Sequence, residues 1–264
     1  QMSINKSIYV GAMSGTSHDA IDVSILKIEK DVTLDFFHSK RIPNSLRTRI
    51  KNIIEQDSVT LVELGQLNKK IGYLFAQAIN ESIVKAKLKR NKIKCVAISG
   101  QTIRHDVACA NPFSMQIGDP NVVCNEIGLT TISDFRNMHI SLGGEGAPLV
   151  PVFHNELFHS SRKSKMILNI GGIANYSYIK NKNHFWGSDV GPGNALMDAY
   201  CQKYLDRPFD KDGKIASKGK VNSRELRRLL LHKFFKQKFP KSTGKELFNL
   251  NMLSKQFLKG SPEN

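Results

Sequence analysis

Residues 8–28 contain an apolar run, a turn of small residues and a second run in which apolar and polar residues alternate. The turn extends from Gly11 to Ser17 in the stretch VGAMSGTSHDAID, and two carboxylates, Asp19 and Asp22, lie just past it. This pattern predicts two strands joined by a glycine turn. A glycine backbone lets a ligand approach closely, and successive N–H groups in such a turn form a nest for an anion.

The carboxylates beside this turn narrow the kind of anion that it would hold. A carboxylate next to a phosphate repels it unless the carboxylate binds Mg²⁺ or orients water. The combination therefore indicates a metal-bound nucleotide. An ordinary glycine hairpin with a solvated aspartate fits the same residues, because short glycine motifs are weak evidence.

A second strand–glycine–strand pattern occurs further along the chain. Residues 166–169 predict a buried strand, Gly171 and Gly172 predict a turn, and residues 173–179 predict the strand that follows. This hairpin resembles the opening one.

The stretch WGSDVGPGN, residues 186–194, predicts a strand that carries Asp189 to its end, where a glycine–proline turn stops it. Asn194 is then a natural N-cap for a helix over 195–205. A carboxylate at a strand end near a helix N-terminus is well placed as a general base beside a bound phosphate. Asp189 could instead cap the turn, but with two glycine hairpins in the chain the pattern favours catalysis.

Length and composition restrict the class of protein. The chain has 264 residues, 40% of them hydrophobic, which is enough for one large or two medium domains. No apolar run reaches the ~18 residues of a membrane-spanning helix, and the N-terminus lacks the apolar region of a signal peptide. The cysteines Cys95, Cys109, Cys124 and Cys201 have no C-x-x-C spacing and predict free thiols in a reducing compartment. We therefore expect a cytoplasmic protein without a membrane partner.

The formal net charge is +16 and the sequence pI is about 9.7. The basic excess lies in residues 1–100 and 201–264, whereas residues 101–200 are nearly neutral. A basic protein can bind nucleic acid, but these lysines fall singly or in pairs without interleaved aromatic residues. We interpret them as a solvated surface and expect no nucleic-acid partner.

Between these motifs the apolar spacing predicts alternating strands and helices. Thr60 followed by Glu63 is a capping-box pattern that begins a long helix, and its apolar positions from Leu61 to Ile83 predict core. The other expected elements are strands over 32–42, 96–98, 113–117 and 129–132, and helices over 45–56, 121–126, 222–235 and 246–258.

Polar side chains follow two of the expected strands. The residues SGQTIRH, 99–105, come after the strand over 96–98, and Asp134 and Arg136 come after the strand over 129–132. Ligands of open α/β sheets bind at such strand ends. These side chains are therefore candidates to bind a polyhydroxylated or acidic substrate, although a polar surface turn fits residues 99–105 equally well.

Two further segments are interpreted from glycine, proline and motif spacing. Residues 142–151, LGGEGAPLVP, predict a loop and a hinge between domains. The stretch KSTGK, residues 241–245, looks like the end of a Walker A motif. It is not one, because the upstream glycine and the preceding strand are missing.

Six segments of the chain resemble, in the same order, motifs of the anhydro-N-acetylmuramic acid kinase family. They are MSGTSHDAID (13–22), GQTIRH (100–105), SDFRNMHISLGGEGAPLVPVFH (133–154), LNIGGIANYSYI (168–179), GSDVGPGNALMDAY (187–200) and FPKSTGKELFNL (239–250). They extend over nearly the whole chain and are much more specific than a single glycine loop.

The resemblance implies an α/β fold with two domains and mixed sheets, of the actin-like and ribonuclease H-like ATPase type. The implied domains are residues 1–135, which bind phosphate and substrate, and residues 136–264, which carry Asp189 and are incomplete at the C-terminal end. The implied enzyme is a bacterial sugar kinase of peptidoglycan recycling. It opens the 1,6-anhydro ring of anhydro-N-acetylmuramic acid with water and phosphorylates the 6-oxygen.

The resemblance also implies cofactors and site residues. ATP and Mg²⁺ are the expected cofactors, Asp189 is the expected catalytic base, no side chain is assigned as a metal ligand, and a homodimer is left open. The residues expected to bind ATP are Gly15, Thr16, Ser17, His18, Asp19, Ala20, Ile21 and Asp22, together with Gly171 and Gly172. The residues expected to contact the amino sugar are Ser14, Gln101, Thr102, Asp134 and Arg136.

The chain departs from the family pattern at several points. His18 stands where the family usually has leucine, Ala20 stands where it has glycine, and the segment before Gly100 lacks the family's His-Gly lead-in. The chain also ends at Asn264, whereas family members continue into segments that bind adenosine. We therefore expect the 264-residue chain alone to bind ATP weakly. An inactive remnant that binds sugar or a partner is the alternative to an active kinase.

Overall fold

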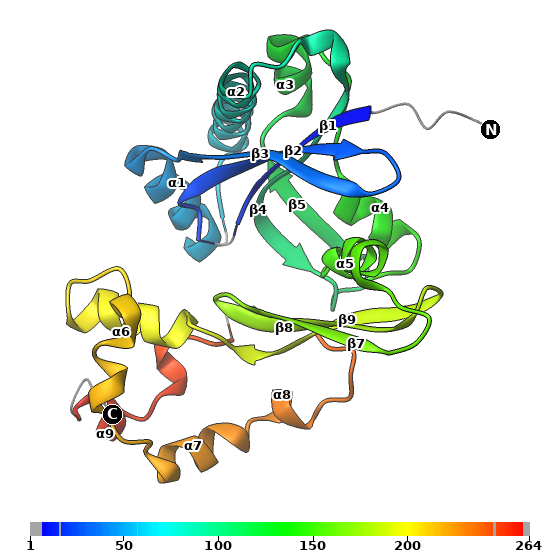
Figure 1. The fold of residues 1–264 in the computed structure, drawn as a ribbon. Helices are drawn as coiled ribbons and strands as arrows, with labels where there is room; N and C mark the ends of the chain where they lie inside the picture. The colour runs from blue at the N-terminus through cyan, green and yellow to red at the C-terminus, as the bar shows by residue number, and fades with distance from the viewer. Residues whose placement is uncertain (1–6, 16, 57, 245–246, 261–264) are drawn as a thin grey trace. The chain divides into compact units, whose positions relative to one another are not determined.

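The structure is a computed structural model, and it describes residues 7–15, 17–56, 58–244 and 247–260. The chain divides into two compact units, residues 1–146 and residues 147–264 (Figure 1). The division falls within the glycine- and proline-rich stretch 142–151. It is later than the expected domain boundary at residue 135.

Helix α4 (Phe135–Ser141) explains the later division. Asn137 on this helix donates to the Ser114 carbonyl at 2.9 Å and accepts from the Ser114 N–H at 2.9 Å. These two hydrogen bonds join α4 to strand β5 (Phe113–Ile117) of the first unit. Residues 136–141 therefore belong with the first unit and not with the second.

Unit 1 is a mixed sheet covered by helices. Its strands are β1 (Ser7–Ser14), β2 (Ala20–Ile28), β3 (Val32–Arg41), β4 (Ile93–Asp106), β5 and β6 (Thr131–Ile132). The first three strands form an antiparallel meander, and β4 and β6 continue the sheet in parallel with β1. The order β3-β2-β1-β4, followed by the parallel β6, is the ribonuclease H-like arrangement that the resemblance implies. The expected α/β class with a mixed sheet is confirmed.

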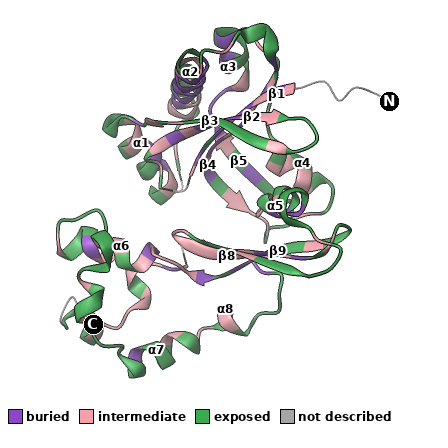
Figure 2. Cartoon of the chain, viewed as in Figure 1, coloured by how far each residue is buried: buried purple, intermediate pink, exposed green. Residues whose placement is uncertain are grey.

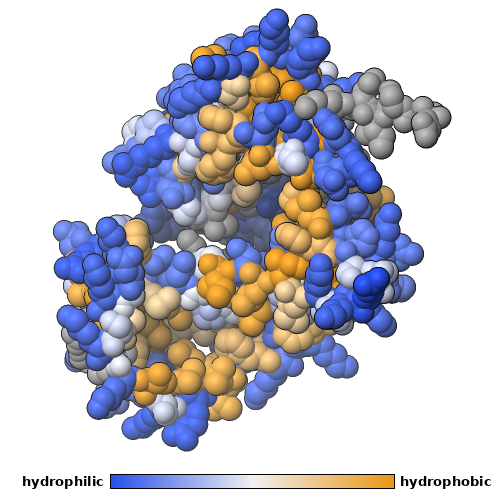
Figure 3. Space-filling model, in the orientation of Figure 1, coloured by the Kyte–Doolittle hydropathy of each residue, from blue (hydrophilic) through white to orange (hydrophobic). Residues whose placement is uncertain are grey.

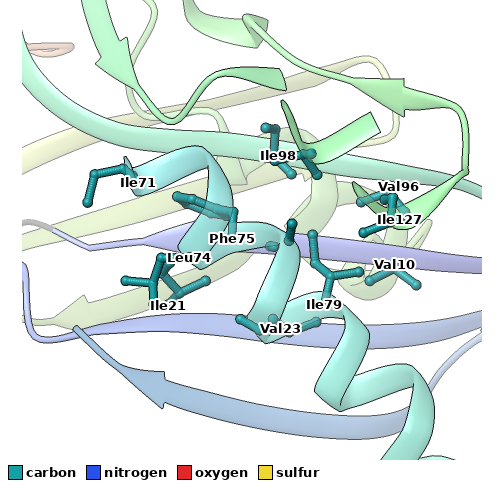
Figure 4. Close-up of a cluster of buried hydrophobic side chains, with 14 of the residues drawn as sticks. Val10, Ile21, Val23, Ile71, Leu74, Phe75, Ile79, Val96, Ile98 and Ile127 are labelled. Carbon is teal, nitrogen blue, oxygen red and sulfur yellow. The ribbon is translucent and has the colours of Figure 1, made fainter. Parts of the chain in front are cut away.

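The main core of unit 1 lies between this sheet and its helices. The helices are α1 (Asn44–Gln56), α2 (Leu61–Lys85) and α3 (Pro120–Ile127), with a short 3-10 helix η1 (Arg90–Lys92). Figure 4 shows Phe75 and Ile79 of α2 among Val23 of β2 and Val96 of β4, and these residues are almost completely buried. Figure 2 shows the same burial along α2 and the central strands.

The predicted start of α2 is confirmed. The Thr60 side chain accepts a hydrogen bond from the Glu63 N–H at 3.1 Å, which satisfies one of the free donors of the first turn. The prediction that Leu61 is core is wrong, because Leu61 occupies the first helical position and is 86% exposed. The apolar stripe that packs on the sheet begins in the next turns, and Leu67 is its first fully buried residue.

Strand β4 is longer than the short strand predicted over 96–98. It continues to Asp106, so residues 99–105 are strand and not a polar turn. Gly100 has φ of +66°, which glycine adopts without a Cβ clash, and the chain bends there from pairing with β1 to pairing with β5. The bend allows the first half of β4 to pair with β1 and the second half to pair with β5. The hydrophobic pattern alone did not indicate this.

Unit 2 begins with helix α5 (Val150–Phe158) and an antiparallel meander of β7 (Lys165–Ile170), β8 (Ile173–Asn181) and β9 (His184–Pro192). Helix α5 packs closely on β9 at Gly187. A Cβ placed on this glycine would lie only 2.5 Å from Pro151 Cγ. Strand β7 is an edge strand. The prediction that it is buried is wrong, because Met166, Leu168 and Ile170 are exposed, and hydrophobic residues remain on the surface (Figure 3).

Short helical segments follow the meander. They are α6 (Ala195–Tyr204), η2 (Lys211–Gly213), η3 (Ala216–Lys218), α7 (Ser223–Leu230), α8 (Lys233–Lys236), η4 (Leu250–Met252) and α9 (Lys255–Leu258). The single helices expected over 222–235 and 246–258 are wrong within the described residues. His232 has an extended ψ of 140° and caps α8, and the Asn249 and Ser254 side chains cap η4 and α9, so each run restarts.

Candidate functional site

The predicted glycine turn lies between β1 and β2. Strand β1 continues through Gly11 to Ser14, so the turn itself is shorter than predicted and spans residues 15–19. Thr16 lies outside the described residues. His18 has φ of 54°, and its N–H donates to the Gly15 carbonyl at 3.2 Å. The described part of the turn consists of Gly15 and residues 17–19, and the anion nest stays a prediction.

Asp19 supplies a carboxylate at this turn. The Ser17 hydroxyl donates a hydrogen bond to Asp19 Oδ1. Burial by itself would raise the pKa of Asp19, but the hydrogen bonds from Ser17 and from the Asp19 and Ala20 backbone outweigh it, so the pKa is lowered. Asp19 is therefore an ionised carboxylate at neutral pH and suits a cation.

The remaining residues of the predicted ATP segment lie in strand β2. Ala20 and Asp22 are half-buried, whereas the Ile21 side chain is fully buried in the core of unit 1. Asp22 is thus within the strand and not just past the turn. Ile21 has only its backbone to offer a ligand.

Ser14 and Gln101 are brought together by the parallel pairing of β1 with β4, in which they are register partners. The Ser14 hydroxyl lies 2.7 Å from Gln101 Oε1 and 3.0 Å from the Ala20 carbonyl. Gln101 Nε2 donates to the Thr102 carbonyl at 3.0 Å. Ser14 is 7% exposed and Gln101 is 1% exposed, so this buried pair joins the end of β1 to the middle of β4.

Thr102 lies beside this pair and is half-buried. Its Oγ1 accepts a hydrogen bond from Gln116 Nε2 at 3.2 Å. The two strands β4 and β5 therefore share a polar side-chain network next to the Ser14–Gln101 pair. Sequence reasoning missed Gln116, because nothing in its local pattern marks a contact across the hairpin.

Asp134 and Arg136 follow the end of strand β6, as predicted, and helix α4 begins there. Asp134 is the N-cap residue with φ of 62°, and its Oδ1 accepts from Asn137 Nδ2 at 2.8 Å. The Arg136 Nη1 donates to the Gly146 carbonyl at 2.8 Å. Burial lowers the pKa of Arg136, and its Nε has no hydrogen-bond partner among the described residues.

In unit 2, the turn of Gly171 and Gly172 contacts the start of α6. The N–H of Asn194 donates to the Gly171 carbonyl at 2.9 Å, and the N–H of Ala195 donates to the Gly172 carbonyl at 3.1 Å. Asn194 occupies the N-cap position as predicted, but its side chain makes no capping bond. This glycine turn presents carbonyl oxygens to the helix.

Asp189 lies within β9, three residues before the strand ends, and is 8% exposed. Its Oδ2 accepts from the Thr243 N–H at 2.8 Å and from the Ser242 hydroxyl at 3.4 Å. Its own N–H donates to the Lys241 carbonyl at 2.9 Å. Sequence reasoning missed these partners, although the KSTGK stretch that contains Lys241 to Thr243 was the signal that could have found them.

Two other features bear on ligands. Within the residues that the structure describes, no cluster of three or more histidine, cysteine, aspartate or glutamate side chains is arranged to hold a metal ion. Mg²⁺ in phosphoryl-transfer sites is held by substrate phosphates, waters and one or two carboxylates, so an ionised Asp19 fits that donor set. A surface hollow of about 750 Å³ in unit 2, lined by residues 159–162 and 181–184, contains none of the predicted site residues.

Across the described part of the chain, no helix has both the length and the apolar character to cross a membrane. All four cysteine thiols are free.

The ribonuclease H-like sheet order defines an α/β protein with the fold of the actin-like ATPase class. Comparison with known proteins makes this specific. The family model described as anhydro-N-acetylmuramic acid kinase matches residues 7–264. The chain belongs to the anhydro-N-acetylmuramic acid kinase family.

Two individual relatives agree with this assignment. The anhydro-N-acetylmuramic acid kinase of Gamma-proteobacterium EBAC31A08 is 60% identical over 260 residues, which are 98% of this chain and 71% of the relative. The enzyme of the same name from Vibrio cholerae serotype O1 is 40% identical over 95% of this chain and 68% of the relative. A solved Ppx/GppA family structure from Aquifex aeolicus aligns with a TM-score of 0.37 at 9% identity, over 81% of this chain and 63% of that one.

Proposed function

We propose that this protein is a sugar kinase that uses ATP to convert 1,6-anhydro-N-acetylmuramic acid to N-acetylmuramic acid 6-phosphate. Water forms a bond to the anomeric carbon, and the bond from that carbon to the 6-oxygen breaks. The 6-oxygen then takes the γ-phosphoryl group of ATP, and ADP leaves. The family assignment and the environment of Asp189 support this proposal, and they favour it over an inactive remnant.

Asp189 is the proposed general base, which accepts the proton of the attacking water. The observation that carries the proposal is its carboxylate, which is nearly buried on a strand and held by a backbone N–H at 2.8 Å. Hydrogen bonds to the charged form of a carboxylate favour that form. A base must be ionised before it can take a proton, so this environment suits the role.

The turn between β1 and β2 is the proposed phosphate site. Gly15 and residues 17–19 form the described part of this turn, and Asp19, which accepts from the Ser17 hydroxyl, offers the ionised carboxylate. Asp19 would hold Mg²⁺, which would supply neutralisation of the charge that develops during phosphoryl transfer. Free thiols and an ATP substrate are consistent with a cytoplasmic enzyme.

Arg136 is the proposed partner of the acid group of the sugar. A guanidinium that is desolvated and retains an unused donor is suited to a carboxylate, which accepts from it in the plane of the fork. Gln101 of β4 and Ser14 of β1 are bonded to each other. We propose that they shape this side of the site, because neither side chain is exposed to a ligand.

The substitution Asp189→Asn tests the proposal. It removes the base while keeping the shape and one oxygen of the side chain. We expect turnover of the anhydro sugar with MgATP to fall by ~10²–10⁴-fold, since that is the usual contribution of a general base. Sugar binding, measured by calorimetry, should change little. Normal turnover in Asp189→Asn would contradict the assignment of the base.

A further inference from the structure

A segment late in the chain lies beside β9 and is bonded to it. The chain returns from α8 to the three-stranded sheet, as Figure 1 shows in orange. The Lys241 N–H donates to Ser188 Oγ at 2.9 Å, and the Lys241 carbonyl accepts from the Asp189 N–H at 2.9 Å. Ser188 is 0% exposed, so these bonds form in the interior of unit 2. Residues 241–243 are therefore fixed to the strand that carries the proposed base.

The two residues after Lys241 reach the carboxylate of Asp189. The Thr243 N–H lies 2.8 Å from Oδ2, which is a short distance for a backbone donor. The Ser242 hydroxyl lies 3.4 Å from the same oxygen and adds a weaker contact. Two donors on one oxygen restrict rotation of the carboxylate about its last side-chain bond.

Lys241 anchors the segment through its side chain. Its ammonium donates to the Phe234 carbonyl at 3.0 Å and lies 4.4 Å and 4.5 Å from the ring centroids of Phe234 and Phe239. Lys241 is 7% exposed. A buried ammonium needs such partners, because desolvation is costly, and two ring faces supply cation–π attraction in place of a carboxylate.

Of the two rings that hold Lys241, Phe234 is buried, whereas Phe239 is 53% exposed. Phe234 contacts Phe248 edge-to-face with centroids 5.2 Å apart, and Phe239 contacts Tyr176 of β8 at 5.8 Å. Phe234 and Phe248 are each 1% exposed. Aromatic pairs of this geometry hold their positions well. The anchor therefore rests on a small aromatic core.

We propose that residues 241–243 are a positioning clamp for the proposed general base. The clamp acts through Asp189 and rests on the function proposed for it. Lys241 fixes the segment, and the Thr243 N–H and Ser242 hydroxyl hold the carboxylate in one orientation. Removing a partner that orients a reacting group costs rate, because the reacting atoms are no longer held in line.

The decisive comparison is Thr243→Pro with Thr243→Ala. Proline removes the N–H that holds Oδ2, whereas alanine keeps it and loses only the side chain. We expect kcat of Thr243→Pro to be on the order of 10–100-fold below that of Thr243→Ala, with KM for sugar and ATP within about twofold. The acid limb of its kcat–pH profile should move to higher pH, because the carboxylate loses a donor to its charged form.

A measurement without turnover keeps the proposal testable if Thr243→Pro does not fold. The Thr243 amide resonance of the isotope-labelled, unaltered protein should shift as Asp189 is protonated during an acid titration. The shift should be absent in Asp189→Asn. Lys241→Met keeps the apolar stem of the side chain and removes the ammonium. This substitution should weaken the coupling between the Thr243 amide and Asp189, and it should lower kcat by a larger factor than it changes KM.

The outcomes separate the two proposals. If Asp189→Asn is inactive while Thr243→Pro and Thr243→Ala have equal kcat and equal pH profiles, the clamp is overturned and the proposed function stands. An amide of Thr243 that ignores the ionisation of Asp189 also overturns the clamp. If Asp189→Asn turns over normally, the base assignment and the clamp fall together.

Discussion

At the scale of single residues, the predicted substrate side chains differ in kind. Ser14 and Gln101 are buried and lie within hydrogen-bond distance of each other, so their role in the site is structural. The guanidinium of Arg136 is desolvated, and its Nη1 donates to a backbone carbonyl. Its Nε has no hydrogen-bond partner among the described residues. A buried cation without a carboxylate is costly unless a ligand supplies the charge.

Arg136 should therefore decide binding of the acid group of the sugar. We expect Arg136→Met to raise KM for the anhydro sugar by about 10-fold or more, because a charge-assisted bidentate contact is worth ~1.5–3 kcal/mol. KM for ATP should stay nearly constant. Steady-state kinetics check this, with Arg49→Lys on α1 as the control. An unchanged sugar KM would remove Arg136 from the substrate site.

At the scale of elements, the sequence correctly predicted features that depend on residues close together in the chain. The Thr60 cap, the bounds of β5 and the glycine turn at 171–172 follow from residues within a few positions. Periodicity did not predict the short C-terminal helices. The Asn249 and Ser254 side chains accept from backbone N–H groups just after them, so a new helical segment starts after each of these residues. Such local competition is invisible to a hydrophobic pattern.

Contacts between segments that are distant in the chain could likewise not be predicted from the sequence. The Gly100 bend continues β4 because β5 is available to pair with its second half. Asp189 was predicted at a strand end because of the following glycines, but the strand continues and residues 241–243 reach it from far along the chain. The type of residue predicted the chemistry, and only the fold identified its partners.

Helix α7 contains an ion pair with a pH-dependent contribution to stability. The Glu225 carboxylate accepts from Arg228 Nη2 at 2.7 Å and Nε at 3.0 Å, and from the Ser254 N–H at 2.8 Å. The Arg228 hydrogen bonds are the main reason that the pKa of Glu225 is lowered from 4.5 to about 2. Because the folded pKa lies below the unfolded one, the contribution is complete above about pH 4.5 and disappears as pH falls toward about 2.

Glu225→Gln should therefore lower the free energy of unfolding in a pH-dependent way. We expect a loss on the order of 1–2 kcal/mol at pH 7, since Arg228 and Ser254 lose a charged acceptor. The loss should shrink steadily below about pH 4.5. Urea unfolding at several pH values measures it, and Glu156→Gln on the exposed side of α5 is the matched control. A loss that is constant with pH would contradict the lowered pKa.

At the scale of the whole molecule, the net charge of +16 raises the question of polyanion binding. The basic side chains of α7 include Arg224, Arg227 and Arg228, and Arg228 is already committed to Glu225. Other lysines lie in ion pairs, such as Lys40 with Glu81 and Lys69 with Asp119. The charge is therefore partly used within the fold.

We expect the protein to bind duplex DNA weakly and without sequence preference. Binding by scattered lysines is driven by counterion release, so it falls steeply with salt. Fluorescence anisotropy with a labelled duplex should show binding near 20 mM salt that is lost by about 150 mM. Binding that persists at physiological salt and prefers one sequence would reinstate a nucleic-acid partner.

The clamp on Asp189 also has a consequence for the order of folding. Asp189 and Thr243 are 54 positions apart, whereas the strands of the meander pair with near neighbours. Closing a loop of that length costs about 3.5 kcal/mol plus a constant, so the contact forms after the local hairpins. On the ribosome, β9 emerges well before residues 241–243. A nascent chain therefore carries both glycine hairpins and the base itself before it acquires the geometry that makes the base effective.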